Sequence, residues 1–122
     1  MRVLVVDDSS TMRRIIVNTL KKLGHEDTVE AGDGKEALRA LAAGVPDVIV
    51  TDWNMPEMNG PQFVEAVRSQ PALAKTPVLM VTTQAAKEDV IVALQAGVND
   101  YLIKPFTPEA LKEKINSLTR KP

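Results

Sequence analysis

The sequence has 122 residues, of which 44% are hydrophobic and 25% charged, an ordinary composition for one globular domain. A formal net charge of −1 provides no basic surface for nucleic acid or for an anionic membrane, and the absence of cysteine excludes disulfides and thiolate metal sites. No apolar run approaches the roughly 18 residues of a membrane span, and the run before Asp7 is too short for a signal peptide. We therefore expect a cytoplasmic protein that binds neither nucleic acid nor membrane.

Short β-branched runs alternate with helical patterns along the whole chain, which is typical of βαβ units on a parallel sheet. We predict strands over residues 2–6, 27–31, 47–51, 77–82 and 100–103, and helices over residues 10–23, 34–44, 61–69, 86–96 and 107–119. Five such units favour a flavodoxin-like, doubly wound α/β fold, (βα)5, whose five-stranded parallel sheet has the order 2-1-3-4-5. The second strand is polar enough to lie at an edge. We expect residues 1–122 to form a single domain without an output domain.

Local signals mark where several helices begin and end. Asp33 can cap the second helix, with Glu36 three residues later as in a capping box. Gly24, Gly44 and Gly97 follow predicted helices, and glycine at such a position readily adopts the left-handed conformation. We expect helices to end at these three glycines.

Polar side chains follow four of the predicted strands, at the point where each strand ends. Asp7 and Asp8 follow the first strand, and Asp52 follows the third. Thr82 closes the fourth strand, and Lys104 follows the fifth. Because the carboxyl ends of parallel strands open on one shared edge, we expect these groups to converge there.

The chemistry of this set favours phosphoryl transfer. Carboxylates about 5 Å apart repel by roughly 3 kcal/mol per pair at an effective dielectric constant near 20, and a bound cation or a nearby ammonium relieves that repulsion. Oxygen ligands favour Mg²⁺, and Lys104 can supply further positive charge. A transferred phosphoryl group spreads charge over three oxygens, which Mg²⁺, Lys104 and Thr82 with backbone N–H groups would meet. A carboxylate can act as the nucleophile, and the central Asp52 is the candidate acceptor.

These residues belong to five ordered motifs that together resemble the receiver domain of two-component response regulators, and most of all the single-domain chemotaxis regulators. The motifs are Asp7-Asp8-Ser9-Ser10-Thr11-Met12-Arg13-Arg14, Asp52-Trp53-Asn54-Met55-Pro56 with Met58-Asn59-Gly60, Thr82, Asn99-Asp100-Tyr101 and Lys104-Pro105-Phe106. The resemblance covers essentially the whole chain. It implies that a histidine kinase passes a phosphoryl group from its phosphohistidine to Asp52.

The resemblance also implies a role for each neighbouring residue in metal binding. Asp8, Asp52 and the backbone carbonyl of Asn54 would ligate Mg²⁺ directly, and Asp7 would act through a metal-bound water. The chain would catalyse only its own phosphorylation and dephosphorylation, so it would not be an enzyme in the usual sense.

The resemblance further implies a switch. Lys104 would contact the phosphoryl oxygens, and its bond to Pro105 would be a cis peptide. Thr82 would move towards the phosphoryl group and Tyr101 would swing inward behind it. A tyrosine near a strand end is also a common half-buried packing residue, which is the alternative for Tyr101.

The implied output surface is formed by the fourth helix, the fifth strand and the fifth helix. Its candidate residues are Lys87, Val90, Leu94, Tyr101 and Lys114. Residues 90–94 are apolar all round, so a helix lying on a sheet cannot bury every one of them; the alternative is a helix buried more deeply than usual, and Lys114 could equally be a solvated lysine. The expected target is the flagellar motor switch, and the alternative is a stand-alone relay or phosphate-sink receiver. We expect a monomer, with a phosphatase as a further partner.

Four other residues qualify this interpretation. Thr83 and Gln84 depart from the pattern of the best-known chemotaxis members and bear on the lifetime of the phosphate. Trp53 is expected to be exposed beside the pocket, and His25 is expected to be a surface turn residue and not a relay histidine.

Two other functions compete with the regulator. A Mg²⁺-dependent phosphatase of the haloacid dehalogenase type also forms an aspartyl phosphate, but would have its nucleophile on the first strand in an Asp-x-Asp arrangement. A flavodoxin-like redox carrier would use a phosphate loop, whereas Ser9-Ser10-Thr11 follows two carboxylates and lacks glycine. Aromatic residues make up only 3% of the chain, which leaves little to flank a flavin.

Overall fold

The structure is a computed structural model that describes residues 1–119. Strands and helices alternate along it. They are β1 (Arg2–Val6), α1 (Ser10–Lys22), β2 (Asp27–Ala31), α2 (Gly34–Ala43), β3 (Val48–Thr51), α3 (Gly60–Arg68), the 3₁₀ turn η1 (Pro71–Leu73), β4 (Val78–Thr82), α4 (Lys87–Ala96), β5 (Asp100–Ile103) and α5 (Pro108–Thr119). Each predicted helix and strand is present with ends that differ by at most one residue. The short turn η1 was not expected from the sequence.

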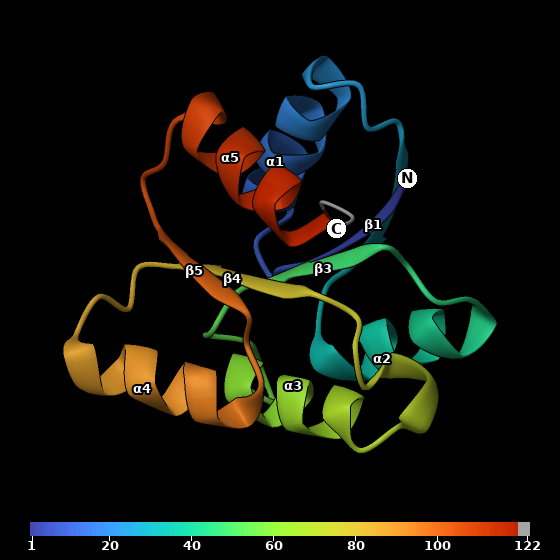
Figure 1. Cartoon of the computed structure of the whole chain (residues 1–122), viewed down its shortest axis with the longest axis vertical. Helices are drawn as coiled ribbons and strands as arrows, with labels where there is room; N and C mark the ends of the chain where they lie inside the picture. Colours follow the sequence, from blue (N-terminus) through green and yellow to red (C-terminus); the bar gives the residue numbers. More distant parts are fainter. Residues whose placement is uncertain (120–122) are drawn as a thin grey trace.

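The strands form one parallel sheet in the order β2-β1-β3-β4-β5, as predicted. In the register of the central strands, Val5 of β1 lies between Glu30 of β2 and Val50 of β3. The polar β2 is an edge strand, also as predicted, and β5 is the other edge. Helices α1 and α5 cover one face of the sheet, and α2, α3 and α4 cover the other (Figure 1). The fold is therefore the flavodoxin-like, doubly wound one.

Alternate residues of the central strands enter two separate hydrophobic cores. Val3 and Val5 of β1 pack with Ile16 and Leu20 of α1, whereas the intervening Leu4 packs in the core on the opposite face. Every residue of β3 and β4 is buried, as expected for parallel strands covered on both faces. This packing gives a rigid platform for the side chains at the strand ends.

The helix signals are only partly confirmed. The Asp33 side chain accepts a hydrogen bond from the Glu36 backbone N–H at 2.8 Å and thereby caps α2. Gly24 and Gly97 adopt left-handed φ values of 94° and 114°. Gly44 also ends its helix, as the C-cap of α2, but its φ of 170° and ψ of 147° are extended and not left-handed, because the chain runs from α2 directly toward β3. Within residues 1–119, no helix has the length and apolar character needed to cross a membrane.

Candidate functional site

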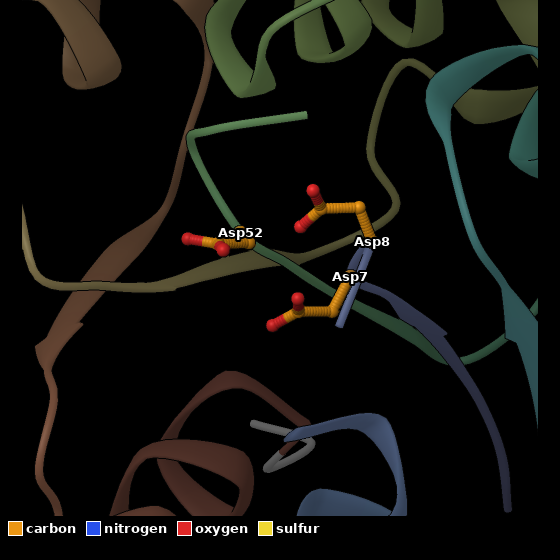
Figure 2. Close-up of side chains that lie close together, drawn as sticks. All are labelled: Asp7, Asp8 and Asp52. Carbon is orange, nitrogen blue, oxygen red and sulfur yellow. The ribbon is translucent and has the colours of Figure 1, made fainter. Parts of the chain in front are cut away.

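The three predicted carboxylates converge at the carboxyl edge of the sheet. Each of Asp7, Asp8 and Asp52 offers an oxygen within 4.8 Å of the others, and Figure 2 shows all three projecting from the ends of β1 and β3. Adjacent strands bring them together, because the Asp52 N–H donates to the carbonyl of Val6 at 2.9 Å. Asp7 is buried, Asp52 is half-buried and Asp8 is exposed, so the cluster opens to solvent on one side.

Lys104 lies against two of these carboxylates. Its Nζ is 3.1 Å from Oδ2 of Asp7 and 3.3 Å from Oδ2 of Asp52. The three side chains are only 11%, 2% and 12% exposed, so solvent screens their attraction weakly. The peptide bond from Lys104 to Pro105 is cis, as the resemblance implied.

Hydrogen bonds and ion pairs distinguish Asp8 from the other two carboxylates. Both oxygens of Asp7 are occupied, Oδ1 by the Ser9 N–H at 2.9 Å and Oδ2 by Lys104. The Asp8 carboxylate accepts no hydrogen bond and forms no ion pair with any residue from 1 to 119. Asp52 is also engaged at both oxygens, because Oδ1 accepts from the N–H of Trp53 at 2.7 Å and Oδ2 lies 3.3 Å from Nζ of Lys104. Asp8 is therefore the carboxylate of the three that is most open to a metal ion.

The donor set fits Mg²⁺. The converging side-chain donors are carboxylate oxygens, the ligands that this hard cation prefers, and Asp8 remains free to bind it. Asn54, whose carbonyl is the remaining predicted ligand, is exposed in the loop after β3. Its side-chain oxygen accepts from Nε2 of Gln84 at 3.4 Å.

A close approach of α3 supports the backbone of Asp52. A Cβ at Gly60 would lie 2.5 Å from the Asp52 carbonyl oxygen and 2.9 Å from the Trp53 Cα, so only glycine fits there. Asn59 caps α3 through a reciprocal capping box with Gln62. The Trp53 side chain is half-buried against the core, and not exposed as predicted, because the tight loop between β3 and α3 turns it inward.

Gln84 connects the two predicted switch residues, Thr82 and Tyr101. Its N–H donates to Oγ1 of the buried Thr82 at 3.2 Å, and its carbonyl accepts from the Tyr101 hydroxyl at 2.6 Å. Burial, with the nearby charges of Asp89 and Asp52, raises the pKa of Tyr101 to about 12. Gln84 was expected near the phosphate, but its connecting role could not be predicted from the sequence, since two of its three contacts use backbone atoms that any residue type supplies.

The predicted output surface is in part exposed. Leu94 is 51% exposed and Ile91 is 44% exposed, because α4 buries only Ala93 and Ala96. The alternative of a deeply buried α4 is therefore wrong. Lys87 is exposed, and Val90 and Tyr101 are half-buried.

Three residues outside the cluster complete the placement of the candidates. Lys114 of α5 forms an ion pair with Asp100 of β5 at 3.0 Å. His25 is half-buried, and its backbone N–H donates to the Leu20 carbonyl in the turn after α1. Thr83 is exposed beside the buried Thr82.

A family model for the response regulator receiver domain matches residues 3–116. The chain belongs to the response regulator receiver family. Chemotaxis protein CheY1 of Helicobacter pylori is 57% identical to it over 116 residues, which is 94% of each chain. The CheY homolog of Campylobacter jejuni is 55% identical over 97% of this chain and 92% of the relative. The chain is thus a response regulator similar to chemotaxis proteins, and proteins of this kind are signalling proteins and not conventional enzymes.

Solved receiver structures share the fold. Chemotaxis response regulator CheY4 of Vibrio cholerae has a TM-score of 0.90 and 40% identity, covering 96% of this chain and 97% of that one. The receiver domain of sensor histidine kinase PA1611 from Pseudomonas aeruginosa has a TM-score of 0.91 and 28% identity, covering 98% of each chain. That structure has a magnesium ion coordinated in its active-site cleft.

Proposed function

We propose that this receiver accepts a phosphoryl group from a histidine kinase on Asp52, with Mg²⁺ bound, and thereby changes its affinity for a target. The observation that carries the proposal is the position of Asp52. Its carboxylate lies within 4.8 Å of those of Asp7 and Asp8, and its Oδ2 is 3.3 Å from the ammonium of Lys104. A nucleophilic carboxylate with a cation on either side is the arrangement that phosphoryl transfer needs.

In the transfer step, a carboxylate oxygen of Asp52 attacks the phosphorus of the phosphohistidine. The new P–O bond forms as the P–N bond breaks, and the electron pair of the broken bond returns to the imidazole nitrogen. Asp8, Asp52 and the Asn54 carbonyl would hold Mg²⁺, which neutralises charge on the carboxylates and on the phosphoryl oxygens. The PA1611 receiver supports this assignment through its coordinated magnesium ion.

Lys104 and Thr82 act on the transferred group. Lys104 already lies 3.3 Å from Asp52, so its ammonium is placed to contact a phosphoryl oxygen bonded there. The Thr82 hydroxyl accepts a hydrogen bond from Gln84 and keeps its own proton to donate. Donation to the phosphoryl group would draw Thr82 towards Asp52.

The contacts of Gln84 offer a route from this site to the output surface. A shift of Thr82 changes its bond to Gln84, whose carbonyl holds the Tyr101 hydroxyl. Tyr101 belongs to β5, the edge strand next to β4 and a part of the proposed output surface. A ligand shifts a conformational equilibrium only by its differential affinity for the two states, so a tenfold change in target affinity needs about 1.4 kcal/mol of coupling.

The target is the flagellar motor switch, and the surface of α4, β5 and α5 binds it. The chemotaxis names of the relatives from Helicobacter pylori and Campylobacter jejuni support this choice, as does the exposure of Leu94. The alternative is a relay or phosphate-sink receiver that does not act on the motor. Capture of motor switch components before and after phosphorylation separates the two, since equal capture in both states contradicts a motor role.

We further propose that residues 1–122 act in the cytoplasm as a single, monomeric receiver domain. The alignment with the Campylobacter jejuni protein, which covers 97% of this chain and 92% of that one, supports this organisation. Sedimentation of the phosphorylated and unphosphorylated protein tests the oligomeric state.

The fluorescence of Trp53, the only tryptophan, tests the central proposal. Its backbone N–H contacts Asp52, so Mg²⁺ should change its emission and acetyl phosphate should change it again. Asp52→Asn should retain no response to acetyl phosphate. No response in the parent protein would contradict the proposal, and steady turnover of small phosphate esters would favour a phosphatase.

A further inference from the structure

The side chain of Arg13, in the first half of α1, joins the acidic cluster to the edge strand β2. Its Nη1 donates to the backbone carbonyl of Asp7 at 2.5 Å. Its Nε donates to Oε1 of Glu30, in β2, at 3.3 Å. The Arg13 side chain is only 20% exposed, whereas that of Glu30 is 50% exposed, so the contact to the Asp7 carbonyl is the more sheltered of the two.

The carbonyl of Asp7 has no partner from regular secondary structure. Strand β1 ends at Val6, and the first carbonyl of the helical ladder is that of Ser9, which accepts from the Arg13 N–H at 3.0 Å. The Asp7 carbonyl lies between these two ladders. A partly buried carbonyl needs a donor, and here the guanidinium of Arg13 supplies it.

Arg13 thereby completes the anchoring of Asp7. The Asp7 N–H donates to the carbonyl of Ala31 at 3.1 Å. Its carboxylate oxygens accept from Ser9 and Lys104, and its carbonyl accepts from Arg13. With every polar group of Asp7 engaged, the peptide plane that leads into Asp8 is held in one orientation.

We propose that Arg13 is a positioning residue of the metal centre: by fixing the Asp7 carbonyl, it holds the Asp8 carboxylate toward Asp52. Asp8 depends on this support because its carboxylate forms no hydrogen bond or ion pair in the described part of the chain. The inference rests on the proposed binding of Mg²⁺. Glu30 contributes by holding the guanidinium from its other side.

The charge of Arg13 and its positioning role have opposite effects on Mg²⁺ affinity. A cation near the cluster repels Mg²⁺, so loss of charge alone should tighten metal binding. Loss of positioning should weaken it. Arg14 is the matched control, because it carries the same charge in the same turn of α1 but is exposed and makes no hydrogen bond or ion pair with residues 1–119.

The experiment is a Mg²⁺ titration of the parent, Arg13→Gln, Arg13→Lys and Arg14→Gln. Binding is measured by Trp53 fluorescence and by calorimetry. Arg13→Gln should bind Mg²⁺ about tenfold more weakly, which corresponds to about 1.4 kcal/mol. Arg14→Gln should bind as the parent does or slightly more tightly. Arg13→Lys keeps the charge but cannot reach both partners, so an intermediate loss of about threefold is expected.

Circular dichroism at the titration temperature establishes that each variant is folded. If Arg13→Gln does not fold, Arg13→Lys decides alone, and parent-like affinity in it overturns the proposal. Affinity in Arg13→Gln equal to or above that of Arg14→Gln also overturns it. In the Arg13→Gln background, Glu30→Gln should have no further effect. Absence of Mg²⁺ binding in the parent would instead refute the proposed function itself.

Discussion

The ammonium of Lys104 lies 3.1 Å from a carboxylate oxygen of Asp7, although 97 positions separate the two residues in the chain. Asp7 is 2% exposed in its side chain, so it depends on this cation in the absence of metal. The same ammonium lies 3.3 Å from Asp52. One lysine therefore stabilises the buried Asp7 and also contacts the proposed acceptor Asp52.

Replacement of Lys104 by Met should lower the free energy of unfolding by about 3 kcal/mol in the absence of Mg²⁺, because it leaves a buried carboxylate without its partner. The loss should shrink when Mg²⁺ is added, since the metal replaces part of the missing charge. Urea unfolding with and without Mg²⁺ measures both values. A loss that is the same in both conditions would contradict this electrostatic account.

Replacement of Asp8 by Asn should have the opposite effect without metal. Asp8 adds a like charge to the cluster and has no cation within the described residues, so its neutralisation should raise the free energy of unfolding by about 1 kcal/mol, allowing for solvent screening. The same variant should lose the stabilisation that Mg²⁺ gives to the parent. Thermal unfolding of the parent and the variant at a series of Mg²⁺ concentrations tests both expectations. A variant that is less stable than the parent without metal would contradict them.

Replacement of Gly60 by Ala should destabilise the protein by about 2 kcal/mol through overpacking. The added Cβ would meet the Asp52 carbonyl oxygen at 2.5 Å, and the backbone cannot yield there without moving the proposed acceptor. Gly32→Ala is the control, because its nearest neighbour atom would lie at 3.5 Å, an ordinary contact. Denaturant unfolding of both variants gives the comparison, and equal stabilities would show that α3 does not constrain Asp52.

Tyr101 should titrate at a pKa of about 12, above its ordinary value of 10.0, because of its burial and the charges of Asp89 and Asp52. The folded state then retains a proton that the unfolded state loses first. Stability should therefore fall as the pH rises from about 10 to about 12, and Tyr101→Phe should lack this component. Absorbance of phenolate is a direct probe, since Tyr101 is the only tyrosine. A midpoint near 10 in the folded protein would contradict the prediction.

The sequence predicted the arrangement of the strands and the convergence of Asp7, Asp8 and Asp52 because both follow from local patterns. A buried run ending in a polar residue marks a strand end, and parallel strands collect their ends at one edge. The burial of Trp53 and the backbone conformation of Gly44 were not predictable in this way. Each depends on how a loop leaves one element to meet the next, which is decided by packing.

The hydrogen bonds of Gln84 and Arg13 illustrate the same limit. Arg13 donates to the backbone carbonyl of Asp7, and Gln84 contacts Thr82 and Tyr101 through its own backbone N–H and carbonyl. Side-chain identity signals a carboxylate cluster, but it does not signal which backbone group lacks a partner. That information appears only once β1, α1 and β4 are placed in three dimensions.

Phosphoryl transfer to Asp52 is the central claim, and locating the modified residue tests it most directly. The protein is incubated with a phosphorylated histidine kinase and Mg²⁺, reduced with borohydride, which converts an aspartyl phosphate to homoserine, and mapped by mass spectrometry. The account predicts homoserine at position 52 in the parent and none in Asp52→Asn. Homoserine at position 7 or 8, or no conversion in the parent, would contradict it.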